Sequence, residues 1–203
     1  MPQTDETSLR QRKKSQLRDR LIAVTVELVE ERGLDGFTAD EIAARAGVGR
    51  ATFFRYFDSL NAAIVVGFYD HRLRSMVNLV REAPASLGPA EALGWMFDRM
   101  VDLHVQEKPA VLRQFLLLQQ HPSLQAIALQ HQATVHEEVL TEALRPRFGR
   151  LRKDDLRPRI LVSATLSAVR SMADIWTQGG GRADLRLMMR QVIRQMSRGF
   201  GPD

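Results

Sequence analysis

The chain of 203 residues contains no cysteine, which excludes disulfide bonds and thiolate metal sites. It has no apolar run near the ~20 residues that a membrane-spanning helix requires, and its N-terminus is polar and basic with no apolar stretch behind it. Hydrophobic residues nevertheless make up 44% of the composition, which is enough for a substantial core. These properties predict a globular, cytoplasmic protein without a membrane partner.

The sequence also lacks the local patterns of common enzyme sites. No serine stands in a nucleophile elbow, and the glycine run at 179–181 lies between two helical patterns rather than after a strand. His131 and His136 are five residues apart, so they miss the shared helix face that a metal pair four residues apart uses. We therefore predict a protein without enzymatic activity, metal or cofactor.

Positive charge is in only modest excess. The net charge is +5 and the isoelectric point is about 10.2, which permits a polyanionic partner without specifying one. Residues 1–60 hold ten Lys or Arg and ten Asp or Glu, so their charges balance. A local basic cluster near the N-terminus comprises Arg10, Arg12, Lys13 and Lys14, and Arg18 and Arg20 follow it. The cluster is either an N-terminal arm that contacts DNA or a solvated tail.

The apolar spacing favours an all-α fold, because no segment has the alternating pattern of a strand. Residues 1–9 are polar and are expected to be disordered. Prolines, glycines and capping residues mark the expected helix ends, and residues 145–153 are expected to form a basic loop. About nine helices result, at residues 15–32, 38–46, 50–57, 60–81, 89–106, 108–118, 122–144, 154–178 and 183–198.

The stretch TADEIAARAGVGRATFFRYF at residues 38–57 has the pattern of a helix-turn-helix. Thr38 and Glu41 form a capping-box pattern at the start of the first helix. Gly47 suits the left-handed position that ends this helix. A second helix is expected to follow from Arg50 to Phe57.

The second helix has the composition of a DNA-reading helix. Its inward side is expected to carry Phe53 and Phe57. The outward side then carries Arg50, Ala51, Phe54 and Arg55. We expect Arg50 to bond guanine O6 and N7 bidentately, a contact worth ~1–3 kcal/mol of discrimination. Arg55 is placed to read a base or hold a phosphate, and Ala51 and Phe54 to contact thymine methyl groups.

Residues 33–64 resemble the TetR family of bacterial transcriptional regulators. The resemblance rests on Gly36-Phe37, Thr38, Ile42-Ala43, Ala46-Gly47-Val48 and the run Thr52 to Phe57. It implies a DNA-binding domain at 1–60, whose arm at about 1–14 contains Arg12, Lys13 and Lys14, and an effector-binding and dimerisation domain at 61–203. It also implies phosphate contacts from Thr38, Thr52 and Tyr56.

Two positions depart from the pattern of the family. Phe54 stands where the family often has tyrosine, and Leu60 stands where it usually has lysine. Each departure removes a group that bonds DNA phosphates. Weaker attachment to the DNA backbone is expected, offset by the basic arm if the arm binds DNA.

The family resemblance also implies a small-molecule effector. Residues 111–122 and 156–176 resemble the subgroup thought to bind acyl-CoA-like ligands, including the mycofactocin-associated regulators. The basic stretch 145–159 suits a CoA phosphate or is a solvated loop. Methionine and aromatic side chains suit an apolar ligand, although the same pattern is typical of plain core. The candidates are Trp95, Met96, Met100, His104, Phe115, Leu118, Leu140, Met172 and Trp176.

The last two expected helices carry apolar stripes that favour a homodimer built as a four-helix bundle. In a monomer the same stripes would be internal core. The residues of the predicted interface are Ile160, Ala164, Ala168, Leu185, Met189, Val192 and Met196.

The family resemblance, together with the helix-turn-helix pattern, implies a homodimeric repressor that an apolar or acyl-CoA-like effector releases from double-stranded operator DNA. An activator of the same fold remains open. An all-helical protein-interaction module without sequence-specific DNA binding is the alternative from another class.

Overall fold

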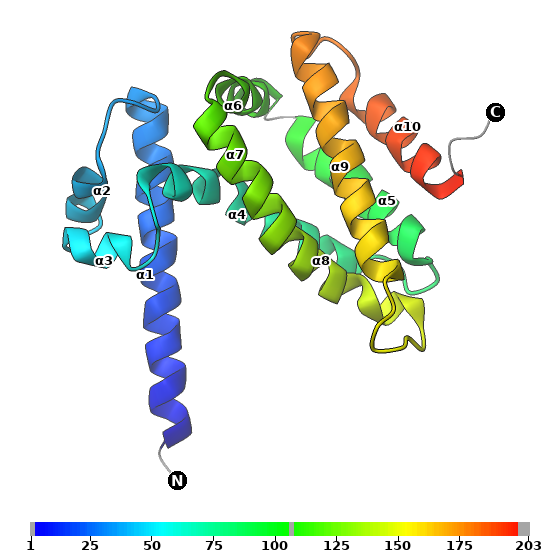
Figure 1. Ribbon diagram of the computed structural model, residues 1–203, viewed down its shortest axis with the longest axis horizontal. Helices are drawn as coiled ribbons and strands as arrows, with labels where there is room; N and C mark the ends of the chain where they lie inside the picture. Colours follow the sequence, from blue (N-terminus) through cyan, green and yellow to red (C-terminus); the bar gives the residue numbers. More distant parts are fainter. Residues whose placement is uncertain (1–2, 106–107, 199–203) are drawn as a thin grey trace. The chain divides into compact units, whose positions relative to one another are not determined.

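The computed structural model describes residues 3–105 and 108–198, and these contain helices and no strand (Figure 1). The predicted all-α fold is confirmed. The segments α7 (Pro122–His131), η1 (Gln132–His136) and α8 (Glu137–Leu144) follow one another without a break. Counted as one, they bring the helices of the described residues to nine, as predicted. The chain divides into two compact units, Met1–His71 and Arg72–Asp203.

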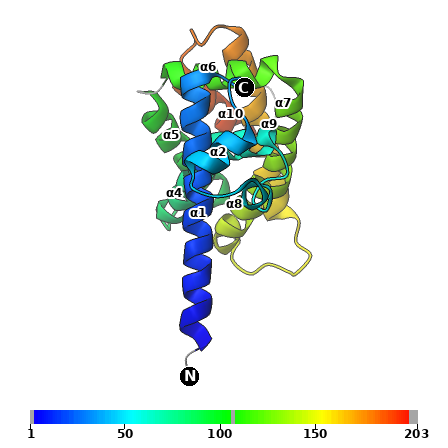
Figure 2. The ribbon, with the colours of Figure 1, turned by 90° about the vertical axis from the view of Figure 1, so that its left-hand side faces the viewer.

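The N-terminal unit contains α1 (Gln3–Arg32), α2 (Ala39–Arg45), α3 (Arg50–Phe54) and the first half of α4 (Leu60–Glu82). Helix α2 contacts both α1 and α3, and Figure 2 shows it lying against the long α1. The start of α4 is capped as expected, since Ser59 Oγ accepts from Ala62 N at 3.0 Å. Each of the four helices contributes buried apolar side chains, among them Leu21, Leu28, Ile42, Phe53 and Ile64.

Helix α1 corrects the prediction for the N-terminus. It begins at Gln3 rather than Ser15, so part of the segment expected to be disordered is helical. Arg12, Lys13 and Lys14 therefore lie on a helix and not on an irregular arm. Neither proline nor glycine interrupts residues 3–32. The first residues of this segment are polar and bury little surface, but polar residues can still have a high helix propensity. Gly33, with φ of 76°, follows the helix end.

The C-terminal unit contains the rest of α4, α5 (Pro89–Val105), α6 (Lys108–Gln120), the α7–η1–α8 run, η2 (Arg145–Phe148), α9 (Arg157–Gln178) and α10 (Leu185–Arg198). Helix α10 packs on α5 and α9, and α8 packs on α9 (Figure 1). Apolar side chains of α4, α5, α8, α9 and α10 form one core cluster.

Several features of this unit differ from the predicted ones. The helix expected over 122–144 contains a π-helical turn at Gln132–His136, and the expected basic loop starts with a 3₁₀ turn at Arg145–Phe148. Helix α9 starts at Arg157, later than the acidic pair that was expected to open it. Asp155 still serves the helix start, because its Oδ1 accepts from Arg157 N at 3.1 Å.

Candidate nucleic-acid interface

The predicted capping box is present at the start of α2. Thr38 Oγ1 accepts from Glu41 N at 3.2 Å, and Glu41 Oε2 accepts from Thr38 N at 2.8 Å. Arg32 donates to the other oxygen, Oε1, at 2.9 Å. The hydrogen bond from Thr38 N, then its hydroxyl and Arg32, hold the pKa of Glu41 below the ordinary 4.5. The first turn of α2 is thereby fixed against α1.

The turn between α2 and α3 depends on Gly47, as the sequence predicted. Its φ is 69°, and Gly47 N donates to Ala44 O at 2.9 Å. Val48 N donates to Ala43 O at 2.9 Å, which completes a Schellman motif. A Cβ atom on Gly47 would lie 2.8 Å from Arg20 Nη2, so α1 passes close to this turn.

Helix α3 has the two faces that were predicted. Phe53 is fully buried, and its ring meets those of Phe54 and Phe57 at 5.1 and 5.4 Å between centroids. Phe57 is buried as well. The outward residues Arg50, Ala51, Phe54 and Arg55 are all exposed. The helix itself ends at Phe54, and Arg55 N still donates to Ala51 O at 3.2 Å.

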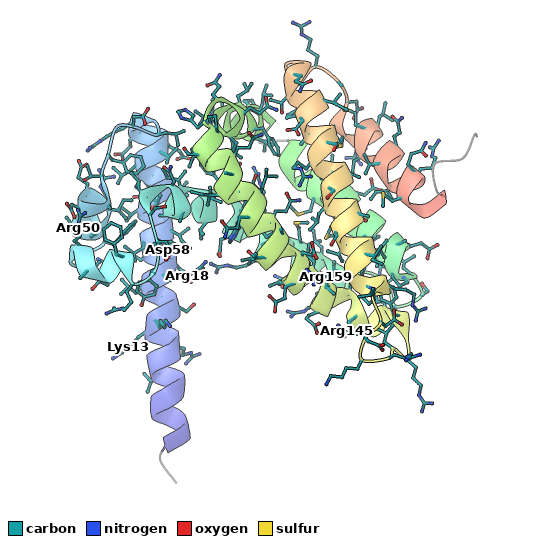
Figure 3. All side chains as sticks on the ribbon, viewed as in Figure 1. Lys13, Arg18, Arg50, Asp58, Arg145 and Arg159 are labelled. Carbon is teal, nitrogen blue, oxygen red and sulfur yellow. The ribbon has the colours of Figure 1, made fainter. Side chains whose placement is uncertain are left out.

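Arg50 is held by a partner that the sequence analysis missed. Its Nη1 lies 2.7 Å from Asp40 Oδ2 of α2, and its guanidinium carbon lies 5.0 Å from the centre of the Phe54 ring. Figure 3 shows Arg50 between α2 and α3. The signal in the sequence was an acidic residue in the first turn of α2, ten positions before Arg50, a spacing that only the folded turn brings into contact.

The other predicted DNA contacts lie as follows. Thr38 is exposed and occupied by the capping box, while Thr52 and Tyr56 are half-buried. The guanidinium of Arg55 stacks over the Tyr56 ring at 5.6 Å. The exposed residues Arg12, Lys13 and Lys14 lie farther along α1, where Figure 3 labels Lys13.

Five of the candidates for the effector pocket belong to the core of the C-terminal unit or pack against it. Met96, Met100, Leu140 and Met172 share the core cluster of the C-terminal unit, with Trp95 packed against it. Leu118 and Trp176 are buried, and Trp176 Nε1 donates to Ala183 O at 3.1 Å. Phe115 is half-buried, and the centre of its ring lies 5.7 Å from the guanidinium carbon of Arg72. The side chain of His104, in α5, lies outside the described part of the chain.

Some residues of the predicted dimer interface belong to the core of the single chain or pack against it, and others are at least partly exposed on its surface. Met189 is buried in the core of its own chain, and Leu185 and Val192 pack against that core, so these three side chains stabilise the single chain. This corrects the placement of Met189 on an intermolecular surface, because α10 needs its apolar stripe to cover α5 and α9. Ile160 is 60% exposed, and Ala164, Ala168 and Met196 are half-buried. Ile175 and Leu187, which the prediction omitted, are each 62% exposed.

The basic stretch 145–159 is largely occupied within the chain. Arg159 Nε lies 2.6 Å from Glu137, and Arg145 Nε lies 3.1 Å from Glu142, both near one end of α9 in Figure 3. Arg157 pairs with Asp155 at 2.7 Å and lowers the pKa of that carboxyl to about 2. These contacts favour the interpretation as a structural and solvated segment over a dedicated phosphate site.

These features define a helix-turn-helix protein with a separate helical unit. Residues 21–61 match the family model described as "Bacterial regulatory proteins, tetR family", and residues 87–201 match the "MftR C-terminal domain". The chain belongs to the TetR family of transcriptional regulators, whose members bind DNA and small-molecule effectors. The relatives are regulators and not enzymes. Among the described residues no helix is long and apolar enough to cross a membrane.

Individual relatives agree with this assignment. The regulator TcmR of Streptomyces glaucescens is 28% identical over 176 residues, which cover 83% of this chain and 76% of TcmR. An uncharacterised helix-turn-helix regulator of Mycobacterium tuberculosis is 30% identical over 126 residues, 60% of this chain, and the match spans 57% of the length of that relative. The repressor FadR of Thermus thermophilus, solved with lauroyl-CoA, has a TM-score of 0.64 at 26% identity, covering 92% of this chain and 96% of FadR.

Proposed function

We propose that this chain is a homodimeric repressor that leaves its operator when an acyl-CoA-like effector binds. The observation that carries the DNA-binding part is the outward face of α3, where Arg50, Ala51, Phe54 and Arg55 are exposed beside a rigid Gly47 turn. Helix α3 enters the major groove, and Arg50 at its first position reads guanine. Thr52 and Tyr56 orient the helix through phosphates.

The effector part of the proposal rests on the C-terminal unit. Its match to the MftR C-terminal domain and its similarity to FadR, which was solved with lauroyl-CoA, support a ligand with an acyl chain. Met96, Met100 and Met172 are flexible side chains in one core cluster, and such side chains can repack around an apolar chain. Ligand binding then shifts the population toward a dimer that cannot fit the operator.

The dimer part rests on the exposed apolar side chains of α9 and α10. Ile160, Ile175 and Leu187 each expose about 60% of their area in the single chain. A twofold mate covers them and places two copies of α3 on half-sites about 34–36 Å apart.

The test is fluorescence anisotropy with the DNA upstream of the gene for this protein and with a scrambled duplex of equal length. We expect the wild type to prefer the upstream DNA by at least about 10³-fold at physiological salt. Arg50→Ala should weaken binding to that DNA by about 5- to 150-fold. Arg152→Ala is the matched control, because that arginine is 86% exposed in a loop of the other unit.

Two results would contradict the proposal. Equal affinity of the wild type for both duplexes, repeated with operator fragments selected from genomic DNA, would remove sequence-specific binding. Equal effects of Arg50→Ala and Arg152→Ala would show that net charge rather than base reading determines affinity. With a working operator, lauroyl-CoA is then titrated against free CoA, and release by the acyl thioester alone supports the effector assignment.

A further inference from the structure

The side chain of Arg50 is held from two directions before any DNA is bound. Asp40 Oδ2, on α2, lies 2.7 Å from its Nη1, and the Phe54 ring, one turn along α3, lies 5.0 Å from its guanidinium carbon. Both charged side chains stay open to solvent, at 64% exposed for Arg50 and 57% for Asp40. The pair therefore lies on the surface that the proposed function assigns to DNA.

The ion pair of Asp40 with Arg50 should contribute little to the stability of the folded chain. Exposed ion pairs contribute little to the free energy of folding, because solvent screens them and two side chains must be ordered. The start of α2 is already capped by Thr38 and Glu41. The pair has a larger consequence for conformation, since it confines a long and flexible arginine to one arrangement.

Arg50 can still bond a base while Asp40 binds its guanidinium group. The contact with Asp40 uses one nitrogen, Nη1, and a guanidinium has five N–H donors in a planar fork. The remaining donors are available to guanine O6 and N7. Ordering the side chain in advance lowers the entropy cost of forming those bonds.

The carboxylate of Asp40 has a second effect on binding. A negative charge beside the reading helix opposes the phosphates of any duplex, whatever its sequence, and so reduces non-specific affinity. On the operator, the ordered guanidinium compensates for this repulsion through base contacts. The repulsion weakens binding to every duplex, whereas the positioning of Arg50 strengthens binding to the operator alone.

We propose that Asp40 is a specificity-determining positioning residue, which holds Arg50 for guanine and disfavours DNA that offers no guanine there. This inference rests on the proposed DNA-binding function. It predicts that loss of the Asp40 charge weakens operator binding and leaves non-specific binding unchanged or stronger. The ratio of the two affinities should fall by about three- to tenfold.

The experiment measures that ratio for the full-length chain with the operator and a scrambled duplex at one salt concentration. Asp40→Asn removes the charge and keeps the shape. Asp35→Asn is the matched control, because it removes an exposed carboxylate from the same unit, in the loop before Thr38. Asp40→Glu keeps the carboxylate and should retain more of the ratio than Asp40→Asn.

A double-mutant comparison separates positioning from a general charge effect. In the Arg50→Ala background, Asp40→Asn should leave the ratio unchanged, because the group that it positions is gone. Operators with single guanines replaced should show that Asp40→Asn relaxes the same base position as Arg50→Ala.

Other outcomes overturn the inference. An unchanged or higher ratio in Asp40→Asn would mean that Asp40 only stabilises α2 or competes with the operator for Arg50. Equal losses in Asp35→Asn would indicate a general charge effect. Failure of the proposed function is seen separately, because then the wild type itself shows no preference for any operator.

Discussion

Arg147, in the 3₁₀ turn η2, binds the C-terminal end of α4 through Nη1 and Nη2, the two terminal nitrogens of its guanidinium group. Nη1 donates to Pro84 O at 2.9 Å and Leu87 O at 3.3 Å, and Nη2 donates to Val80 O at 3.0 Å and also to Ala83 O. The last carbonyl groups of a helix lack partners within the helix. One arginine, sixty or more residues away in the sequence, supplies partners to this helix end and to the following turn.

Replacing Arg147 with methionine keeps most of the apolar stem and removes every donor. Val80 is fully buried and Ala83 is 4% exposed, so water cannot replace Arg147 as the hydrogen-bond donor to their two carbonyl groups. At about 1–3 kcal/mol for each unsatisfied carbonyl, the cost is about 2–6 kcal/mol. For a chain of this size that lowers the Tm by about 4–24 °C.

Tryptophan fluorescence reports this change in the right place, because the two tryptophans of the chain, Trp95 and Trp176, both belong to the C-terminal unit. Arg145→Met is the matched control, since this arginine of the same turn pairs with Glu142 at the surface and should contribute about 0.3–0.5 kcal/mol. Equal melting temperatures for the two variants, or a change of about 1 °C or less in Arg147→Met, would refute the role of Arg147 as a cap of α4.

Two further predictions concern the N-terminal unit, and a third concerns the surface of the C-terminal unit. Gly47→Ala should destabilise by about 1–2 kcal/mol and weaken DNA binding, because φ is 69° there; Gly49→Ala, with φ of −84° and open space around it, should lower the melting temperature less, because it loses only the preference for glycine over alanine at the N-cap of α3. Because the pKa of Glu41 is lowered in the folded state, its cap stabilises above pH 4.5 and is lost as the pH falls through the lowered pKa; an NMR titration giving a pKa of 4.5 or higher for Glu41 would contradict this. Ile175→Glu or Leu187→Glu should raise the dissociation constant of the dimer by about 30- to 100-fold, whereas Leu129→Glu, 40% exposed, should leave it unchanged by analytical ultracentrifugation. An unchanged dimer in both α9 and α10 variants would rule out this interface.

The sequence predicted the helix-turn-helix well because its signals are local. Thr38 and Glu41 are three residues apart, and Gly47 determines the turn by its own backbone conformation, so both could be assigned without knowing the fold. The burial of Phe53 and the exposure of Arg50 on opposite sides of α3 follow from helical spacing alone.

The errors arose where tertiary contacts or weak signals decide the outcome. The ion pair of Asp40 with Arg50 and the cap on α4 by Arg147 join residues that only the folded chain brings together. Met189 was assigned to a dimer surface because a stripe of apolar residues does not reveal which neighbour covers it. The predicted start of α1 is wrong because polar residues do not by themselves indicate disorder and are compatible with a helix.

The most direct test of the central claim is a selection of genomic DNA fragments by the purified full-length chain, with Arg50→Ala as the comparison. We predict that the wild type enriches a palindromic motif with a guanine in each half-site, since a twofold dimer reads two half-sites. Arg50→Ala should lose the preference for that guanine. A selection that enriches no motif, or the same motif with both proteins, would contradict the account of this chain as a DNA-reading regulator in which Arg50 specifies the operator.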